Sequence, residues 1–310
     1  RATWRRLMVL SLTVPALGFM CYLAAQYWNE AWAWIANAHP LLILVSLAAL
    51  LTSSYGSALI FVASIQGGAA SPARDSRRKL IASFLLSQIG KYVPGRIWGV
   101  VLQKALLSAD LPIHSVILTN LELAALSLAL TGGSAVAFMA WFFLGIAWGC
   151  VAFVIVGIAL YLVLALKLPG RASVLLHRLL PGPSRLPAGA LQEKPDYTPS
   201  LVGLVLYGVG YCTGWLCLML AGDSANLDES LRLTALLSLS YVIGVISLLP
   251  AGVGSREVAL LVIGEWFGLE TSSLASVAIV TRLALLVVEF AAALLGAAML
   301  PFRRRHRGYS

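Results

Sequence analysis

Charged residues are scarce in this chain, and the scarcity excludes a water-soluble fold. Asp, Glu, Lys and Arg make up 11% of the 310 residues, whereas 60% are hydrophobic. A typical soluble domain has about 25% charged residues. We therefore expect an all-α polytopic membrane protein, folded as a single integral domain over residues 1–310.

The sequence also lacks the motifs of common enzyme classes. It has no glycine-rich phosphate loop, no nucleophile elbow and no group of residues at metal-ligand spacing. Its four cysteines lie inside apolar runs, which is typical of small buried hydrophobic residues. We therefore expect no enzyme activity, no cofactor and no bound metal.

The net charge is +9, but the basic residues do not indicate a nucleic-acid partner. They lie mostly at the ends of apolar runs, where Lys and Arg orient a membrane protein and contact anionic lipid. In the arrangement of membrane spans predicted from the apolar runs, 17 of the 22 Lys and Arg residues lie on one side of the membrane and only Arg232 lies on the other. The sequence therefore predicts a multi-pass protein of the cell inner (cytoplasmic) membrane, with both termini in the cytoplasm.

Apolar runs of about 20 residues, long enough to cross a bilayer, define this layout. We predict six full spans, at about residues 7–28, 41–65, 113–130, 149–166, 201–221 and 271–300. Thr131-Gly132-Gly133 is predicted to end the third span, and the aromatic stretch after it is either an outer interfacial helix or a tilted extension. The basic segment 171–180 has the pattern of an amphipathic helix on the cytoplasmic surface.

Two further apolar segments are each interrupted near their middle. Residues 80–107 are broken by Lys91-Tyr92-Val93-Pro94-Gly95-Arg96, and residues 233–268 are broken by a turn that begins at Pro250. Proline removes a backbone donor and glycine costs about 1 kcal/mol in a helix, so each break leaves helices too short to cross. We predict two re-entrant helical hairpins. The alternative is that proline and glycine only kink two ordinary spans.

Each half of the chain then has the same order of elements: span, span, broken hairpin, span. The first half covers about residues 1–133 and the second about 134–310. Because each half contains three full crossings, the second is inverted and the two hairpins enter from opposite sides. Breaks at corresponding points of inverted halves are typical of a transporter site at the membrane midplane.

Residues beside the two breaks are the candidate substrate-binding residues. They are Lys91, Tyr92, Pro94, Gly95, Arg96 and Trp98 in the first hairpin, and Gly252, Gly254, Arg256 and Glu257 in the second. Cations are costly inside a membrane, so an anionic ligand is their natural partner, and the free N–H groups that open a helix suit a phosphate. The alternative is that these charges neutralise one another.

Three more ionisable residues lie within the predicted spans: Glu122, Arg282 and Glu289. We expect each to act mainly as an ion-pair partner of a hairpin charge. Either carboxylate is also a candidate proton carrier, if transport is coupled to protons.

The residues around both breaks resemble those of a known family. The resemblance is carried by GKYVPGRIWGVVLQKALL (Gly90–Leu107), Asn120-Leu121-Glu122, LPAGVGSREVALL (Leu249–Leu261) and Thr281-Arg282-Leu283. These segments look like the lysylphosphatidylglycerol synthase transmembrane-region family, also called the flippase-like domain. The residues that match its pattern are Pro94, Gly95, Glu122, Pro250, Gly252, Gly254, Arg256, Glu257 and Arg282. Ala251 departs from the pattern, because a second glycine is usual there.

The resemblance implies a lipid-handling membrane protein, and we expect a stand-alone member without a synthase domain. Members are associated with moving aminoacylated phospholipids or polyprenyl-linked sugars between leaflets. We therefore expect a flippase or scramblase whose partner is an anionic lipid or a lipid-linked saccharide. Two alternatives stay open: a membrane subunit that presents lipid to a partner glycosyltransferase, and an integral lipid-modifying enzyme. The sequence also leaves open the headgroup and whether the protein forms a homo-oligomer.

Overall fold

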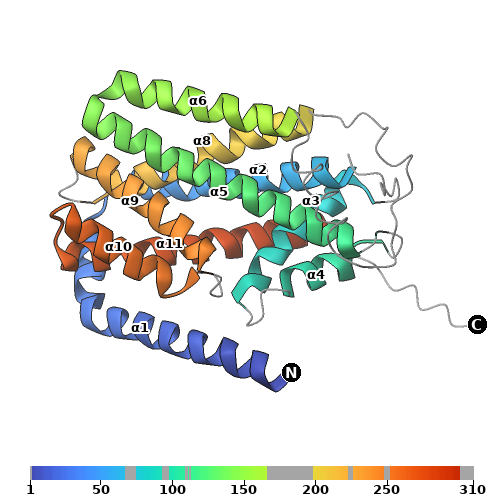
Figure 1. The fold of residues 1–310 in the computed structure, drawn as a ribbon, viewed down its shortest axis with the longest axis horizontal. Helices are drawn as coiled ribbons and strands as arrows, with labels where there is room; N and C mark the ends of the chain where they lie inside the picture. The colour runs from blue at the N-terminus through green and yellow to red at the C-terminus, as the bar shows by residue number, and fades with distance from the viewer. Residues whose placement is uncertain are drawn as a thin grey trace, which may run out of the picture.

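The computed structural model is a bundle of helices, most of which run roughly along one long axis (Figure 1). It describes residues 2–66, 75–92, 98–108, 111, 113–165, 198–222, 226–247 and 252–300. The helices are α1 (Ala2–Asn37), α2 (Pro40–Gln66), α3 (Arg77–Ser87), η1 (Gln88–Tyr92), α4 (Trp98–Leu106), α5 (Ile113–Leu144), α6 (Ile146–Ala165), α8 (Thr198–Leu220), α9 (Leu227–Ile246), α10 (Ser255–Trp266) and α11 (Thr271–Met299).

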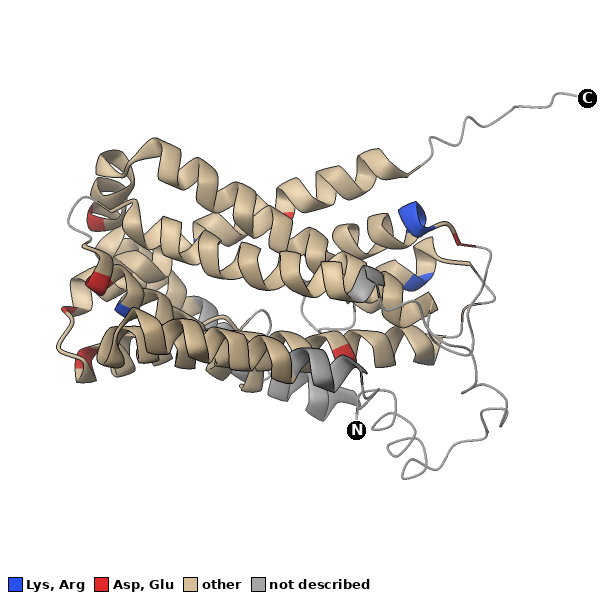
Figure 2. Cartoon of the chain, turned by 90° about the horizontal axis from the view of Figure 1, so that it is seen from above, with Lys and Arg blue, Asp and Glu red and all other residues tan. Residues whose placement is uncertain are grey.

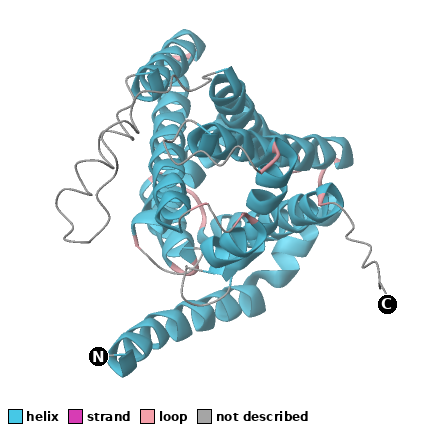
Figure 3. Ribbon diagram, turned by 90° about the vertical axis from the view of Figure 1, so that its right-hand side faces the viewer, coloured by secondary structure: helices cyan, strands magenta, loops and turns pink. Residues whose placement is uncertain are grey.

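The predicted all-α polytopic membrane fold is confirmed. Within the described residues, five helices are long and apolar enough to cross a membrane: α2, α5, α8, α9 and α11. The view along the bundle shows helices joined by loops and turns, and the described residues form no strand (Figure 3). The second, fifth and sixth predicted spans correspond to α2, α8 and α11, and the fourth corresponds to α6.

The first predicted span lies within α1, which is longer than predicted and kinked. Tyr27 has non-helical dihedrals (φ −116°, ψ 18°), and the chain changes direction there. The N-terminal part of α1 runs along the outside of the bundle (Figure 1). The predicted amphipathic helix at residues 171–180 and the basic C-terminal tail lie outside the described residues.

The third span does not end where the sequence predicts. Helix α5 runs without interruption through Thr131-Gly132-Gly133 to Leu144, and the chain turns at Gly145, whose φ is 94°. A Cβ at Gly133 would lie 2.4 Å from the side chain of Val156 on α6, so glycine serves helix packing here. The aromatic stretch that follows Gly133 is therefore an extension of the third span and not a separate interfacial helix.

Both interrupted segments are divided into separate helices, as predicted. In the first, α3 and the short 3-10 helix η1 precede α4, which has nine residues. In the second, α9 precedes α10, whose 12 residues rise about 18 Å, or roughly half of a hydrocarbon core about 30 Å thick. The prediction that both arms of each hairpin are too short to cross is wrong for α9, which begins at Leu227, has 20 residues and is one of the five helices long enough to cross. Helices α3 and α4 lie toward one end of the bundle and α10 toward the other (Figure 1).

Each hairpin packs into its own apolar core. The larger core joins α8, α9, α10 and α11 and includes Trp215, the largest of the fully buried side chains. The other joins the first hairpin to α2, where the rings of Phe61 and Phe84 lie 5.3 Å apart. The short helices of the hairpins, α3, α4 and α10, are thus held by longer neighbouring helices.

Helix contacts occur in corresponding pairs along the two halves of the chain. Helix α11 packs on α1 and α3, and α5 packs on α6 and α9 in the same way. Helices α2 and α8, the second span of each half, pack on each other. This pattern supports an inverted repeat whose halves meet at the α5–α6 turn, although the division of the single domain into two repeat halves stays a prediction.

Charge is distributed unequally between the two ends of the bundle. Most of the described Asp and Glu residues lie at the end where α9 begins and α10 ends, whereas Lys and Arg gather at the end where α3 begins (Figure 2). This distribution agrees with the predicted orientation, in which the basic end faces the cytoplasm.

The contact between α2 and α8 depends on glycine. A Cβ at Gly56 would lie 2.5 Å from the backbone nitrogen of Tyr207 and 2.6 Å from the carbonyl oxygen of Gly203. A Cβ at Gly210 would lie 2.5 Å from the carbonyl oxygen of Ala49. Small residues let membrane helices approach backbone to backbone, and here they fix the spacing between the two halves.

Adding a methyl group at this contact will destabilise the protein. Gly56→Ala and Gly210→Ala should each lower the free energy of unfolding by about 1–3 kcal/mol, because the two backbones must move apart. Gly157→Ala on α6 is the control, since nothing lies within 4 Å of its added Cβ. The measurement is the melting temperature of the purified protein in detergent. Equal melting temperatures for all three variants would contradict the close contact.

The open end of the first hairpin is closed by Asp75. Its Oδ1 accepts a hydrogen bond from Nζ of Lys79 at 2.5 Å, and its Oδ2 accepts one from the backbone N–H of Ser108 at 2.7 Å. Burial acts to raise the pKa of Asp75, but the hydrogen bonds from Lys79 and Ser108 outweigh it and hold that pKa below its usual value. Because Asp75 precedes α3 and Ser108 follows α4, one carboxylate joins both ends of the hairpin.

The stabilisation supplied by Asp75 should depend on pH. Its pKa is lower in the folded state, so its contribution is complete above the unfolded value near 4 and is lost as the pH falls through the folded value. Asp75→Asn should lower the free energy of unfolding by about 1 kcal/mol at pH 7, and this difference from wild type should shrink below about pH 4. Melting temperatures across pH test this, with Glu270→Gln as control, because the Glu270 side chain makes no capping hydrogen bond. A constant difference at all pH values would contradict the role of the carboxylate.

Candidate functional site

A cavity of about 260 Å³ lies between the two hairpins. Its walls come from α2, α3, η1 and α5 of the first half and from α8, α9 and α11 of the second. The polar residues in its lining are Ser53, Ser54, Ser57, Gln88, Asn120, Ser127, Tyr207, Tyr211, Tyr241 and Glu289. A polar cavity enclosed by membrane helices is a candidate binding site, because such a lining is unfavourable against hydrocarbon.

Glu257 holds the turn of the second hairpin together. Its Oε2 accepts a hydrogen bond from the backbone N–H of Gly254 at 2.7 Å and so caps the first turn of α10. Its Oε1 accepts a hydrogen bond from Nε of Arg282 on α11 at 2.5 Å. Nη2 of Arg282 in turn donates to the carbonyl oxygen of Gly252 at 3.1 Å. These contacts tie the turn, α10 and α11 to one another.

The two glycines of this turn are required by its backbone. Gly252 has a φ of 62° and Gly254 a φ of 83°, a region that residues with side chains rarely adopt. A Cβ at Gly252 would also lie 3.1 Å from the carbonyl oxygen of Gly244 on α9. The turn therefore packs closely against α9 and lets α10 begin deep within the bundle.

Arg256 stands next to Glu257 in the chain but has different neighbours. Consecutive residues on a helix do not face each other, and Glu257 is paired with Arg282 instead. The side chain of Arg256 is buried, and its guanidinium carbon lies 5.5 Å from the ring centre of Trp215 and 5.6 Å from that of Tyr241. Both rings line the cavity, and Arg256, which is not itself a lining residue, lies behind them.

One nitrogen of this guanidinium is unsatisfied. Nη2 of Arg256 has no hydrogen-bond partner in the part of the chain that the structure describes. Contacts with aromatic rings offset part of the cost of burying a cation, but a buried donor without an acceptor still costs about 1–3 kcal/mol or more. An anionic oxygen at this position would remove that cost.

Beside the cavity, the first hairpin contributes neutral hydrogen bonds, and its Asp75–Lys79 ion pair lies at the open end. Gln103 on α4 donates to Oγ of Ser87 on α3 at 2.8 Å and accepts from Nδ2 of Asn120 on α5 at 2.7 Å. Gln103 is only 1% exposed, and its amide joins both arms of the hairpin to α5. Asn120 and Gln88, the residue after Ser87, line the cavity.

Comparison with known proteins identifies the family. The model described as lysylphosphatidylglycerol synthase TM region matches residues 6–293, which include both hairpins and the whole cavity lining. The chain belongs to this family. The matched model is that of the membrane region, which agrees with the polytopic helical fold. No curated protein and no solved structure matches the chain.

In this member of the lysylphosphatidylglycerol synthase TM-region family, the second hairpin brings five predicted residues together. They are Gly252, Gly254, Arg256, Glu257 and Arg282. Their contacts show how a glycine turn and an ion pair position one buried arginine. Direct contact with a substrate stays a prediction for all of them.

The other predicted residues are more widely distributed. Glu289 lines the cavity, Glu122 is half-buried on α5 and is not among the lining residues, and Trp98 is 47% exposed at the start of α4. The residues Pro94, Gly95, Arg96 and Pro250, with the side chains of Lys91 and Tyr92, lie outside the described residues. Their roles stay predictions.

Sequence reasoning missed the aromatic wall of this family member and the buried amide of Gln103. Tyr207, Tyr211 and Trp215 recur every four residues, so they lie on one face of α8. That spacing was visible in the sequence, but a stripe of aromatics at helical spacing is ordinary in a membrane span. Which face lines a cavity is decided only by packing.

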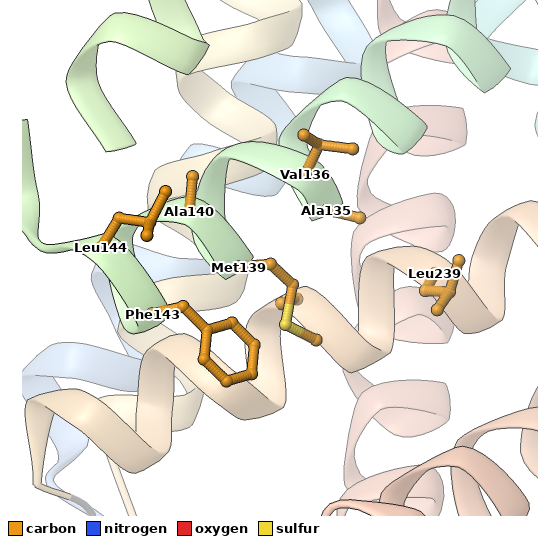
Figure 4. A pocket seen from close by; sticks show the side chains of 8 residues that line it. Ala135, Val136, Met139, Ala140, Phe143, Leu144 and Leu239 are labelled. Carbon is orange, nitrogen blue, oxygen red and sulfur yellow. The ribbon is translucent and has the colours of Figure 1, made fainter. Parts of the chain in front are cut away.

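A second hollow, of about 430 Å³, lies between α5 and α9 (Figure 4). Its lining is apolar: Ala135, Val136, Met139, Ala140, Phe143, Leu144, Ala235 and Leu239. It offers no donor, acceptor or charge to a headgroup. The polar cavity beside Arg256 is therefore the better candidate for the functional site.

Removing one member of the Glu257–Arg282 pair will destabilise the second hairpin. Glu257→Gln and Arg282→Gln each leave a buried charge without this partner, which costs about 3–5 kcal/mol. The double variant should cost less than the sum of the two, because it leaves neither charge of the pair behind. Melting temperatures of the four purified proteins complete the cycle, and additive losses would show that the two residues are not coupled.

Proposed function

We propose that this protein moves a phosphate-bearing lipid between the leaflets of the membrane, as a flippase or scramblase. The observation that carries the proposal is buried Arg256, which lies against two rings that line the polar cavity, those of Trp215 and Tyr241, with Nη2 unsatisfied among the described residues. A phosphate oxygen is the acceptor that best suits a guanidinium. The headgroup would enter the cavity while the lipid tails stay in the bilayer.

The physical problem in this function is the charge of the headgroup. Moving an uncompensated charge through hydrocarbon costs several kcal/mol at least. Arg256 is the second residue of α10, and the helix from there to Trp266 covers about half the thickness of the membrane core. A cation at that depth lowers the barrier where the headgroup is farthest from water.

The Glu257–Arg282 pair has a supporting role in the proposal. If Glu257 paired with Arg256, the cation would be neutralised before a lipid arrived. Arg282 engages Glu257 instead, and the same contact fixes the turn on which Arg256 stands. The site thus keeps a positioned cation available for the phosphate.

The proposal places the basic end of the bundle in the cytoplasm and treats the protein as a transporter of the inner membrane. It also assigns no catalytic step to the chain. Among the described residues that line the cavity, Glu289 is the single carboxylate, and there is no histidine or cysteine. The match to the membrane region of a synthase family fits a transport role.

Substituting Arg256 should slow translocation without preventing folding. In proteoliposomes containing fluorescent phosphatidylglycerol, read by a quencher added outside, Arg256→Gln should lower the rate at least about tenfold, which corresponds to losing roughly 1.4 kcal/mol of stabilisation. Arg256→Lys should retain part of the rate, because it keeps the charge but loses the planar fork. Arg232→Gln is the matched control: Arg232 also lies over an aromatic ring, 4.5 Å from Phe142, but neither Arg232 nor that ring lines the cavity.

The outcomes separate the proposal from its alternatives. A wild-type rate in Arg256→Gln would show that the site is wrongly assigned. Absence of translocation by the purified protein, with lipid binding and stimulation of a co-purified glycosyltransferase, would indicate a lipid-presenting subunit. Chemical conversion of the headgroup by the purified protein, detected by mass spectrometry, would indicate an enzyme.

A further inference from the structure

The apolar hollow between α5 and α9 has a cation beside one end. Arg232 is on α9, and its guanidinium carbon lies 4.5 Å from the ring centre of Phe142 on α5. The next residue, Phe143, lines the hollow, and its ring is directed from α5 toward α9 (Figure 4). Ala235, less than one turn after Arg232, lines the hollow from the other side. The guanidinium and the hollow therefore adjoin each other between the same two helices.

Arg232 uses little of its hydrogen-bonding capacity. A guanidinium carries five N–H donors. Nη1 donates to the carbonyl oxygen of Phe267 at 3.4 Å, whereas Nε is buried and has no hydrogen-bond partner among the residues that the structure describes. No ion pair within the described part of the chain involves Arg232. The side chain as a whole is only half-buried, so an anionic oxygen can reach the guanidinium from outside the bundle.

One face of α9 carries a carboxylate, this cation and apolar side chains in order. The residues are Asp228, Arg232, Ala235 and Leu239. Their spacings of four, three and four residues place them on a single stripe of the helix. Asp228 lies next to the start of α9, and Leu239 lines the hollow about 10 Å further into the bundle than Arg232. The stripe thus changes with depth from anionic to cationic to apolar.

Carboxylates around the cation disfavour a ligand that is only anionic. Asp228 and Glu229 precede Arg232 by four and three residues, which makes both its neighbours on the surface of α9. Glu265 is two residues before Phe267, whose carbonyl oxygen accepts the hydrogen bond from Arg232. A ligand with both charges suits this arrangement better, because its anionic oxygen meets the guanidinium and its cationic group meets the carboxylates.

The rest of such a ligand must be an apolar chain. The hollow has a volume of about 430 Å³ and an apolar lining, which is within the range of sites that enclose a drug-sized ligand. Val136, Phe143 and Leu144 in this lining are largely exposed, so the hollow is open at the surface of the bundle. Between membrane helices that surface faces hydrocarbon, and an acyl chain is the apolar group that fills it.

We propose that this hollow and Arg232 bind a zwitterionic phospholipid with a primary ammonium headgroup, which is the chemistry of phosphatidylethanolamine. The phosphate binds to Arg232, the ammonium group bonds to Asp228 and Glu229, and one acyl chain lies along the hollow. The lipid comes from the leaflet at the acidic end of the bundle. Neither Arg232 nor any residue of the hollow lines the central cavity, so this site is separate from the proposed transport path.

The test uses a phosphatidylethanolamine that carries a photoreactive diazirine in one acyl chain. The purified full chain in detergent is irradiated with this lipid, and mass spectrometry of its peptides shows which residues are labelled. Label should appear on residues 135–144 of α5 and 235–239 of α9. Unlabelled lipids with dioleoyl tails then compete for that label. Phosphatidylethanolamine should compete at about tenfold lower concentration than phosphatidylglycerol, and dioleoylglycerol, which lacks a phosphate, should compete least.

Three changes to the charged groups test the headgroup contacts. Arg232→Gln should weaken the label at these positions about tenfold, and Arg232→Lys should retain part of it because the charge remains. Asp228→Asn combined with Glu229→Gln should abolish the preference for phosphatidylethanolamine over phosphatidylglycerol. Glu270→Gln is the control, because it removes a carboxylate at the same end of the bundle whose side chain makes no capping hydrogen bond.

A change within the hollow tests the position of the acyl chain. Val136→Phe adds volume to the lining at a side chain that is 63% exposed, so it should displace the acyl chain and leave the fold intact. Val205→Phe on α8 is the control, because Val205 is also exposed but does not line the hollow. This pair decides the question even if Arg232→Gln does not fold.

Equal labelling of the wild type and Val136→Phe, or of the wild type and a folded Arg232→Gln, overturns the inference. Equal or stronger competition by phosphatidylglycerol overturns the assignment of the headgroup. Absence of label, with a dimer in detergent that Val136→Phe dissociates, overturns it in favour of an interface between two copies of the chain. The readout is binding at α5 and α9 and not translocation, so this inference and the proposed function can fail separately.

Discussion

The organisation of this protein depends on how a charge is held inside a membrane. A buried ion is tolerated only if a counter-charge or hydrogen bonds replace the water that it has lost. Glu257 meets this condition with Arg282 and with a backbone N–H of the turn. The same contacts hold a short helix at a depth where no loop could otherwise stay. Structural stability and the placement of Arg256 therefore have one cause.

The two hairpins solve the same problem with different chemistry. Beside the cavity, the two arms of the first hairpin are joined by the neutral amide of Gln103, whereas the second hairpin is joined to α11 by an ion pair. Each also packs into an apolar core with longer helices, most of them from its own half of the chain. The cavity lies where these two arrangements meet, so its lining combines neutral groups from one half with aromatic rings and the carboxylate of Glu289 from the other. The cation of Arg256 lies behind two of those rings.

Glycine has two separate uses in this fold, and only one of them is conformational. Gly252 and Gly254 adopt positive φ angles and make the turn possible. Gly56, Gly133 and Gly210 lie within regular helices and allow close helix packing. A glycine pair in a membrane segment therefore does not by itself mark the end of a span. This ambiguity explains why the end of α5 could not be predicted from Thr131-Gly132-Gly133.

The sequence by itself determined the membrane class, the approximate position of most spans and the two interrupted segments, because hydropathy and proline-glycine breaks act locally along the chain. It also singled out Arg256, Glu257 and Arg282, since charges within apolar runs are conspicuous. Only the tertiary structure decided that Glu257 pairs with Arg282 and that Arg256 lies against Trp215 and Tyr241. These contacts join residues from different helices, and helix rotation and packing set them. The linear pattern of residues specifies neither the rotation of each helix nor its packing.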